Sequence, residues 1–256
     1  MDKCYKTFVT AAALGEVGYT EKKSIKDIFK KIDGAGTNNY TKYSWYFDNE
    51  MQNFYNGKKQ GAPWCDQFVD YCFCKAFGVP NALRLLCQHE KSSGAGCLYS
   101  MRYYIKAGQF FYEPQTGDQL FFGKKGDTSG ASHTGIVVKA DGKRVYTVEG
   151  NKNNAVRQCS YKLTDKTIIG YGRPDYDPLP LPSALPTLKK GSKGESVRYL
   201  QSALITLGYS CGTCGVDGSF GSATLAAVKA FQKNHRLNVD GVFGIKTWSE
   251  LHRSLS

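Results

Sequence analysis

A cluster of prolines divides the chain into two parts. Five of the eight prolines in the 256-residue sequence lie between Pro174 and Pro186, where neither helical nor alternating hydrophobic spacing continues. Proline fixes φ and has no backbone N–H, so a helix or central strand does not pass through such a run. We therefore predict an extended spacer over residues 174–187, between a first part of residues 1–173 and a second part of residues 188–256. Each part is long enough to bury a core of its own.

The second part carries one short motif twice. VDGSFGSAT begins at Val216 and VDGVFGIKT begins at Val239. Apolar residues recur every three or four positions in three segments, which predicts three short helices, each with one apolar stripe. The stripes consist of Val197, Leu200, Leu204 and Leu207, of Leu225, Val228 and Phe231, and of Trp248, Leu251 and Leu255. The Asp-Gly pairs predict tight turns, and because His235 and His252 have no acid or thiol at a catalytic spacing, we expect no catalytic site here.

These blocks resemble the peptidoglycan-binding domain found at the ends of many bacterial and phage wall hydrolases. The resemblance runs in order through LKKGSKGESVRYLQSALITLGY, VDGSFGSATLAAVKAFQ and NVDGVFGIKTW. It implies that the second part binds bacterial peptidoglycan. The insertion SCGTCG departs from the pattern. Because no second cysteine pair lies nearby, we expect Cys211 and Cys214 to form a local disulfide or to remain free thiols rather than to supply half of a zinc site.

The strongest local signal of the first part is the segment GAPWCDQFVDYCFCKAFGVP. Its apolar positions follow one face of a helix; they are Cys65, Phe68, Val69, Cys72, Phe73, Ala76 and Phe77. Pro63 precedes this helix, and Gly78 and Pro80 end it. Cys65 lies in the first turn, where unpaired backbone N–H groups and the helix dipole are expected to lower its pKa and favour the thiolate. Cys72 and Cys74 are interpreted as packing residues.

A nucleophilic thiol needs a base nearby, and usually a third group that orients the base. The first part contains two histidines. His89 lies in a polar run and is interpreted as a solvated residue. His133 begins SHTGIVVKADGKRVYTVEGN, in which two alternating apolar runs flank Ala-Asp-Gly, a pattern that predicts a β-hairpin. Glu149 and Asn151 lie at the end of the second run.

The length of the hairpin loop decides whether these residues meet. A two-residue turn at Asp141-Gly142 would place His133 and Glu149 on opposite faces of the sheet. A three-residue loop of residues 140–142, with Gly142 in the left-handed region as a G1 bulge, places His133 directly opposite Glu149. Asn151 then follows on the same face. We predict the three-residue loop.

The blocks GAPWCDQFVDYCF and GDQLFFG…SHTGIVV…VYTVEGN together resemble the CHAP domain, the cysteine and histidine dependent amidohydrolase/peptidase module of the papain-like superfamily. The resemblance spans roughly residues 50–173 and implies an α+β fold, with the Cys65 helix packed on an antiparallel sheet. It also implies that Cys65 is the nucleophile, His133 its base, Glu149 the orienting acid, and Asn151 a helper near the oxyanion. Residues before this span fit an N-terminal helical extension.

The resemblance implies hydrolysis of an amide bond in peptidoglycan, either as an N-acetylmuramoyl-L-alanine amidase or as a peptide endopeptidase. Both activities would use the same four residues. We expect no cofactor and no metal, because FYNGKKQGAPW, before the nucleophile, lacks the carboxylates that bind calcium in some members. Gln60 in this stretch is a candidate oxyanion donor, although a solvated loop glutamine is the favoured interpretation.

The formal net charge of +12 suits an acidic partner. Basic residues are scattered, with +7 in residues 1–187 and +5 in residues 188–256, which argues against a phosphate-binding stripe for nucleic acid. By the family resemblance, the modular build and the basic charge suit a Gram-positive wall rich in anionic polymers. No apolar run is long enough to insert into a membrane, and the N-terminus lacks the pattern of a signal peptide. We therefore expect a monomeric protein that resembles phage endolysins and stays in the host cytoplasm until holin-type release. A catalytically inactive wall-binding adaptor and a host autolysin remain as alternatives.

Overall fold

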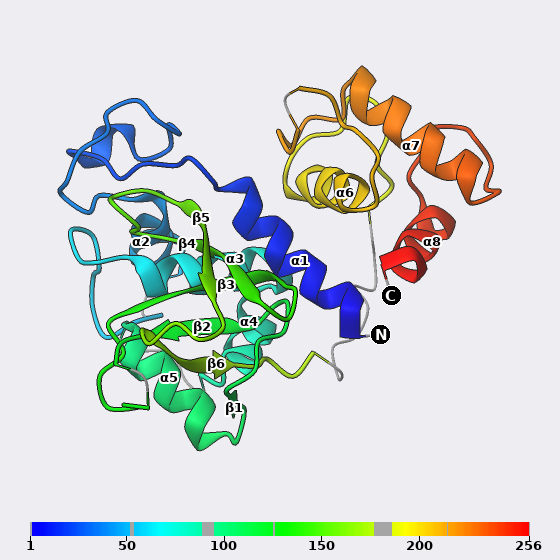
Figure 1. Cartoon of the computed structure of the whole chain (residues 1–256). Coiled ribbons are helices and arrows are strands. Elements are labelled where there is room, and N and C mark those ends of the chain that lie inside the picture. The colour runs from blue at the N-terminus through cyan, green and yellow to red at the C-terminus, as the bar shows by residue number, and fades with distance from the viewer. Residues whose placement is uncertain are drawn as a thin grey trace. The chain divides into compact units, whose positions relative to one another are not determined.

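The chain divides into two compact units in the computed structural model (Figure 1). One unit is Glu16–Asp175, and the other combines Met1–Gly15 with Tyr176–Ser256. The N-terminal helix, which we expected in the first part, therefore groups with the C-terminal part. Most of the predicted spacer, residues 177–185, lies outside the described residues. The structure describes residues 2–51, 54–88, 95–124, 126–176, 186–213 and 215–255.

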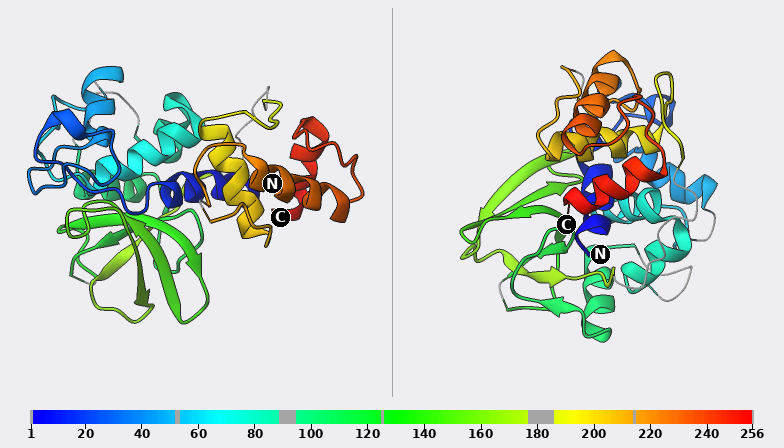
Figure 2. Two further views of the ribbon diagram at one scale, coloured as in Figure 1. Left: turned by 90° about the horizontal axis from the view of Figure 1, so that it is seen from above. Right: turned by 90° about the vertical axis from the view of Figure 1, so that its right-hand side faces the viewer.

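The unit Glu16–Asp175 combines helices with an antiparallel sheet, so the predicted α+β class is confirmed. Its helical elements are η1 (Ile25–Asp27), α2 (Lys42–Trp45), η2 (Tyr46–Glu50), α3 (Cys65–Phe77), α4 (Val79–Leu85) and α5 (Cys97–Lys106). Its strands are β1 (Phe110–Phe111), β2 (Gln119–Phe122), β3 (His133–Ala140), β4 (Arg144–Glu149), β5 (Arg157–Lys162) and β6 (Ile168–Gly172). They form one sheet in the order β1-β6-β2-β3-β4-β5, and Figure 2 shows the helices of residues 42–85 stacked on one side of it.

Helix α3 begins and ends where the sequence predicts. It runs Cys65–Phe77, and Gly78 ends it with a φ of 73°, a backbone conformation that glycine adopts without a steric cost. Its apolar face is buried as far as Phe73, and Ala76 and Phe77 in the last turn are partly buried. The helix also buries two carboxylates, Asp66 and Asp70, which the apolar stripe did not predict.

The β3–β4 hairpin has a shorter turn than predicted. The backbone N–H of Asp141 donates to the carbonyl of Arg144 (3.1 Å), so the central residues of the turn are Gly142 and Lys143. Gly142 has the predicted positive φ, at 80°, and Lys143 does not share it. A glycine with positive φ at the first central position is typical of a type II′ turn. The predicted three-residue loop is therefore wrong.

A bulge within β3 restores the predicted face. Lys139 pairs with Tyr146, but Val137 pairs with Thr147, so Val138 is an extra residue in β3. Because of this extra residue, His133 and Glu149 lie on one face of the sheet, as predicted. They are not directly opposite, however. Ile136 pairs with Val148, which puts Gly135 opposite Glu149, and His133 is its diagonal neighbour.

The other unit contains α1 (Asp2–Gly15), α6 (Glu195–Thr206), α7 (Ser222–Asn234) and α8 (Ile245–Leu255). The last three are the helices that the apolar stripes predict. Helix α1 packs beside α6, where the ring of Phe8 stacks on that of Tyr199 with 3.9 Å between centroids. In the described part of the whole chain, no helix has the length and apolar character needed to cross a membrane.

A buried glutamine closes each copy of the repeated motif. Gln201 donates to the carboxylate of Asp217 (2.7 Å) and accepts from the backbone N–H of Gly218 (2.8 Å). Gln232 makes the same two bonds with Asp240 (2.9 Å) and with the N–H of the residue after it (2.9 Å). The two turns are thus built by the same contacts, each from the preceding helix.

Candidate functional site

Two of the candidate side chains form a hydrogen-bonded pair. Nε2 of His133, the first residue of β3, lies 2.9 Å from a carboxylate oxygen of Glu149, the last residue of β4. The imidazole is one-fifth exposed and the carboxylate is buried. With Nε2 engaged, Nδ1 of the ring makes no hydrogen bond to the described residues, so it can serve a reacting group.

Three further side chains hold the Glu149 carboxylate. Thr147 donates to one oxygen (2.5 Å), Tyr161 donates to the other (3.2 Å), and the Lys152 ammonium lies 3.5 Å from the second oxygen. Burial raises the pKa of Glu149, but the hydrogen bonds from His133 and Thr147 and the nearby positive charges outweigh burial, and the net pKa lies below the ordinary value. The carboxylate is therefore charged and oriented at neutral pH.

The end of β4 touches the first turn of α3. A Cβ built on Gly150 would lie 2.4 Å from Cβ of Phe68 and 3.0 Å from Cζ3 of Trp64, so only glycine fits there. This contact brings the strand of Glu149 against the turn that carries Cys65. Among the described residues, no hydrogen bond joins Cys65 to His133.

The Cys65 thiol does not have the lowered pKa that its helix position predicts. It lies within hydrogen-bonding reach of a second thiol, Cys97, the first residue of α5. This hydrogen bond and then burial raise the pKa of Cys65 well above the ordinary value, and they outweigh the backbone N–H group that favours the thiolate. Cys65 therefore keeps its proton until a base removes it.

The other two candidates make different contacts. Asn151 follows β4 with a positive φ of 57°, and its amide nitrogen lies 3.4 Å from the Oδ1 atom of Asn39. The side chain of Gln60 pairs with the backbone of Thr41, accepting from its N–H (3.0 Å) and donating to its carbonyl (2.9 Å). Their roles near an oxyanion stay predictions.

Comparison with known families finds a match for each part of the chain. Residues 57–151 match the family model of the CHAP domain, and the match includes Cys65, His133 and Glu149. The chain contains a CHAP domain. Residues 193–251 match the model of a peptidoglycan binding domain. Both resemblances seen in the sequence are therefore confirmed.

Two curated relatives share only a short stretch with this chain, about a quarter of its length. It is 47% identical over 60 residues to the N-acetylmuramoyl-L-alanine amidase CwlL of Bacillus licheniformis, and this stretch covers 23% of the chain and 17% of that amidase. It is 39% identical over 67 residues to the zinc D-Ala-D-Ala carboxypeptidase of Streptomyces albus G, 26% of each protein. A solved endolysin of the Burkholderia phage AP3 is 47% identical over 26% of this chain and 24% of its own, with a TM-score of 0.24.

The stretch of residues 54–64, before Cys65, is contacted by a carboxylate from outside it. The carboxylate that reaches it is Asp48, whose two oxygens accept the backbone N–H groups of Lys59 (2.7 Å) and Gln60 (2.9 Å). Within the described ranges, no group of three or more His, Cys, Asp or Glu residues could hold a metal ion. Cys211 is buried with its thiol 3.8 Å from the carbonyl of Gln201, and Cys214 and His89 lie outside the described residues.

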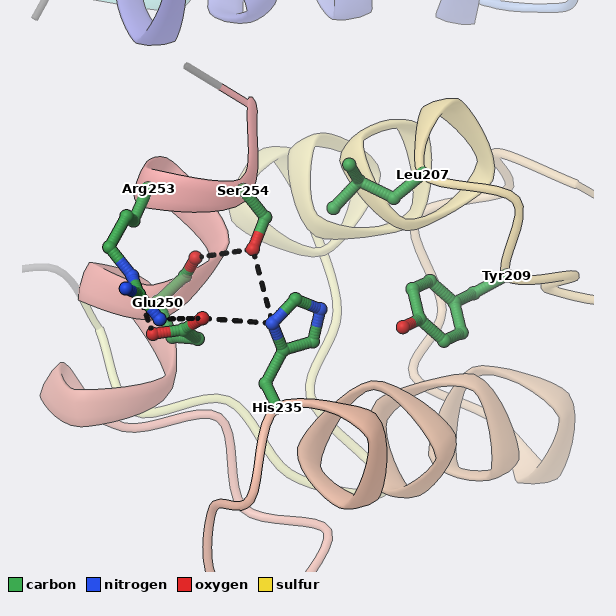
Figure 3. A pocket seen from close by; sticks show the side chains of 6 residues that line it. All are labelled: Leu207, Tyr209, His235, Glu250, Arg253 and Ser254. Carbon is green, nitrogen blue, oxygen red and sulfur yellow. Dashed lines mark hydrogen bonds and ion pairs between the residues drawn. The ribbon is translucent and has the colours of Figure 1, made fainter.

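The peptidoglycan binding domain contains a pocket of about 390 Å³ (Figure 3). Figure 3 shows Leu207 and Tyr209 on one side, Glu250 and Arg253 on the other, and His235 between them. His235 Nδ1 lies 2.8 Å from Glu250, which also accepts two bonds from Arg253 (2.8 and 3.1 Å). His235 thus has an acid partner, contrary to the sequence expectation.

Sequence reasoning missed the residues that support Glu149. Thr147 could have been found, because a residue two positions earlier on a strand shares its face. Tyr161 could not, because it comes from β5, whose pairing with β4 no sequence signal fixes. Cys97 lies far from Cys65 in the sequence and carries no catalytic motif.

Proposed function

We propose that this protein hydrolyses an amide bond of bacterial peptidoglycan through a cysteine nucleophile. The observation that carries the proposal is the hydrogen-bonded pair of His133 and Glu149, on strands whose end packs against the first turn of the Cys65 helix. The match to the CHAP domain supports a hydrolase. The matched peptidoglycan binding domain supports peptidoglycan as the substrate.

In the proposed mechanism, His133 takes the proton of Cys65 when substrate is bound, and the thiolate attacks the carbonyl carbon. This proton transfer is needed because burial and Cys97 keep Cys65 protonated in the free protein. Backbone N–H groups at the start of α3 stabilise the oxyanion. The imidazolium gives its proton to the leaving amine, and Glu149 stabilises the charge on the ring. Water then releases the acyl group from sulfur.

We propose that the C-terminal pocket binds peptidoglycan. Tyr209 and Leu207 form an apolar side on which a ligand can pack. A guanidinium has five N–H donors, and Arg253 uses two of them on Glu250, so the others are available. With His235, these donors suit a carboxylate of a wall stem peptide.

We also propose where the protein is stored, which type of wall it acts on, and that it acts as a monomer. The seven cysteines whose side chains are described are all free thiols, which supports storage in a reducing compartment such as the host cytoplasm before holin-type release. The net charge of +12 supports a Gram-positive wall with its anionic polymers. A monomer suffices, because the candidate residues come from one chain.

The first experiment compares Cys65→Ala with Cys72→Ala on purified peptidoglycan. Cys72 is a fully buried thiol on the same face of α3, about two turns after Cys65. We expect Cys65→Ala to abolish release of fragments at an unchanged melting temperature, and Cys72→Ala to retain most activity. Full activity of folded Cys65→Ala would refute the mechanism. Mass spectrometry of the fragments then identifies the bond that is cut. A free lactyl group on the muramoyl sugar indicates an amidase, and a new peptide amine indicates an endopeptidase.

The second experiment tests the pocket in the Cys65→Ala background, so that the wall is bound but not cut. We expect Arg253→Ala to reduce retention on peptidoglycan stripped of anionic polymers, and Lys246→Ala, an exposed charge on the same helix, to leave it unchanged. Equal loss in both variants would mean that charge alone holds the wall.

A further inference from the structure

Two cysteines meet at the candidate active site, and the proposed hydrolysis uses only one of them. Cys65 is the first residue of α3 and Cys97 is the first residue of α5. The two side chains belong to one cluster of packed, buried residues, their thiols lie within hydrogen-bonding reach of each other, and neither is in a disulfide. Each is 8% exposed, so the pair touches solvent without being open to large molecules.

A buried carboxylate fixes the two helix starts together. Asp66, next to Cys65, accepts the backbone N–H of Gly96 (2.9 Å) and the hydroxyl of Ser100 (2.9 Å), both in the first turn of α5. Its other oxygen accepts from Gln119 on β2 (3.1 Å). The contact between the thiols is therefore built into the fold through side chains that are themselves buried.

The second thiol also lies in the first turn of a helix, where backbone N–H groups favour a thiolate. As a thiol, Cys97 donates to the carbonyl of Ala131 (3.4 Å); as a thiolate, it accepts from Cys65. The hydrogen bond from Cys65 lowers the pKa of Cys97, and the backbone N–H groups of its own helix turn add to this, against burial. By contrast, burial raises the pKa of Cys87, in the same core cluster, to about 11.

We propose that Cys65 and Cys97 are a redox modification site, in which a reversible disulfide formed by a hydroperoxide removes the nucleophile and stops hydrolysis. The Cys97 thiolate attacks one oxygen of hydrogen peroxide, the O–O bond breaks, and Cys97 becomes a sulfenic acid as hydroxide leaves. The sulfur of Cys65 then attacks the sulfenic sulfur, and its proton leaves with the hydroxyl as water. Two thiols are oxidised to one disulfide and one peroxide is reduced to two waters. A dithiol reductant reverses the change.

In the test, the 256-residue chain is treated with hydrogen peroxide and the remaining thiols are blocked. Disulfide-linked peptides are then mapped by mass spectrometry. We expect a peptide pair joining Cys65 to Cys97, with activity falling as the pair accumulates and returning in dithiothreitol. This mapping does not depend on activity, so it stands even if the proposed hydrolysis fails. Loss of activity without the Cys65–Cys97 pair would overturn the proposal.

Two variants sharpen the test, each measured against its own untreated rate. In Cys97→Ala, peroxide should oxidise Cys65 beyond rescue, so that dithiothreitol restores little of the lost activity. Cys87→Ala, a thiol of the same core cluster that bonds to Gln109, should recover as the wild type does. Full recovery of Cys97→Ala would refute the role of Cys97, and failure of the wild type to recover would refute reversibility.

Discussion

Replacing Gly150 with alanine tests the contact that joins the candidate site. The new Cβ would lie 2.4 Å from Cβ of Phe68, whereas packed carbons rest about 3.5 to 4.0 Å apart. Neither atom is at the end of a flexible side chain, so β4 and α3 must separate by about 1 Å or more. Overpacking of this kind costs about 1 to 3 kcal/mol. At about 2 to 4 °C per kcal/mol for a unit of this size, the melting temperature should fall by about 2 to 12 °C.

The same displacement should affect catalysis. A shift of about 1 Å in reacting groups can cost about 100-fold in rate, and here it separates the helix of Cys65 from the strand of Glu149. We would measure fragment release from peptidoglycan together with thermal unfolding by circular dichroism. The matched control is Gly130→Ala, where the new Cβ meets the Asp127 side chain at ordinary contact distances (3.4 Å to Oδ2 and 3.8 Å to Cγ) and φ is not positive. Unchanged stability and rate in Gly150→Ala would refute the described approach of α3 to β4.

Three further predictions concern stability. In the folded protein the pKa of Glu149 lies below its ordinary value of 4.5, so the stability that its carboxylate contributes is complete above about pH 4.5 and is lost as the pH falls through the folded pKa. Glu149→Gln should therefore flatten the acid side of a plot of melting temperature against pH. An unchanged acid side would contradict this. Gln201→Ala leaves the N–H of Gly218 without its acceptor, and urea unfolding should show a loss of about 1 to 3 kcal/mol. Gly142→Ala forces a side chain into positive φ, and should cost about 1 to 2 kcal/mol by the same assay, whereas no loss would argue against the described turn.

Local patterns predicted the parts of the fold that local physics decides. The apolar face of α3, with proline before it and glycine after it, fixed both ends of the helix. The shared face of His133 and Glu149 depends only on whether the register is odd or even, and the demand that they meet selected the right parity. That argument could not distinguish a bulge in the turn from a bulge at Val138, because both add one residue.

The sequence could not predict features whose partners lie far along the chain. Asp66 is buried because Gly96, Ser100 and Gln119 supply donors from other elements, and no spacing rule connects them. The expectation that the pKa of Cys65 is lowered was wrong for the same reason. Its helix position was right, but the neighbouring thiol comes from a helix that begins about thirty residues later.

The bulge at Val138 separates the tip of the hairpin from its base. Residues 133–136 are held by β2 through regular pairs, from Gln119 with Ile136 to Phe122 with His133. Beyond the bulge, in the described part of the chain, backbone pairing joins the exposed tip at Gly142 to its own hairpin, to β5 and to Leu163 just after β5. Insertions at the tip can therefore be absorbed on the far side of the extra residue. This tip is a natural attachment point for an epitope or a fluorescent label, because a graft there leaves the pairing of His133 with its neighbouring strand intact.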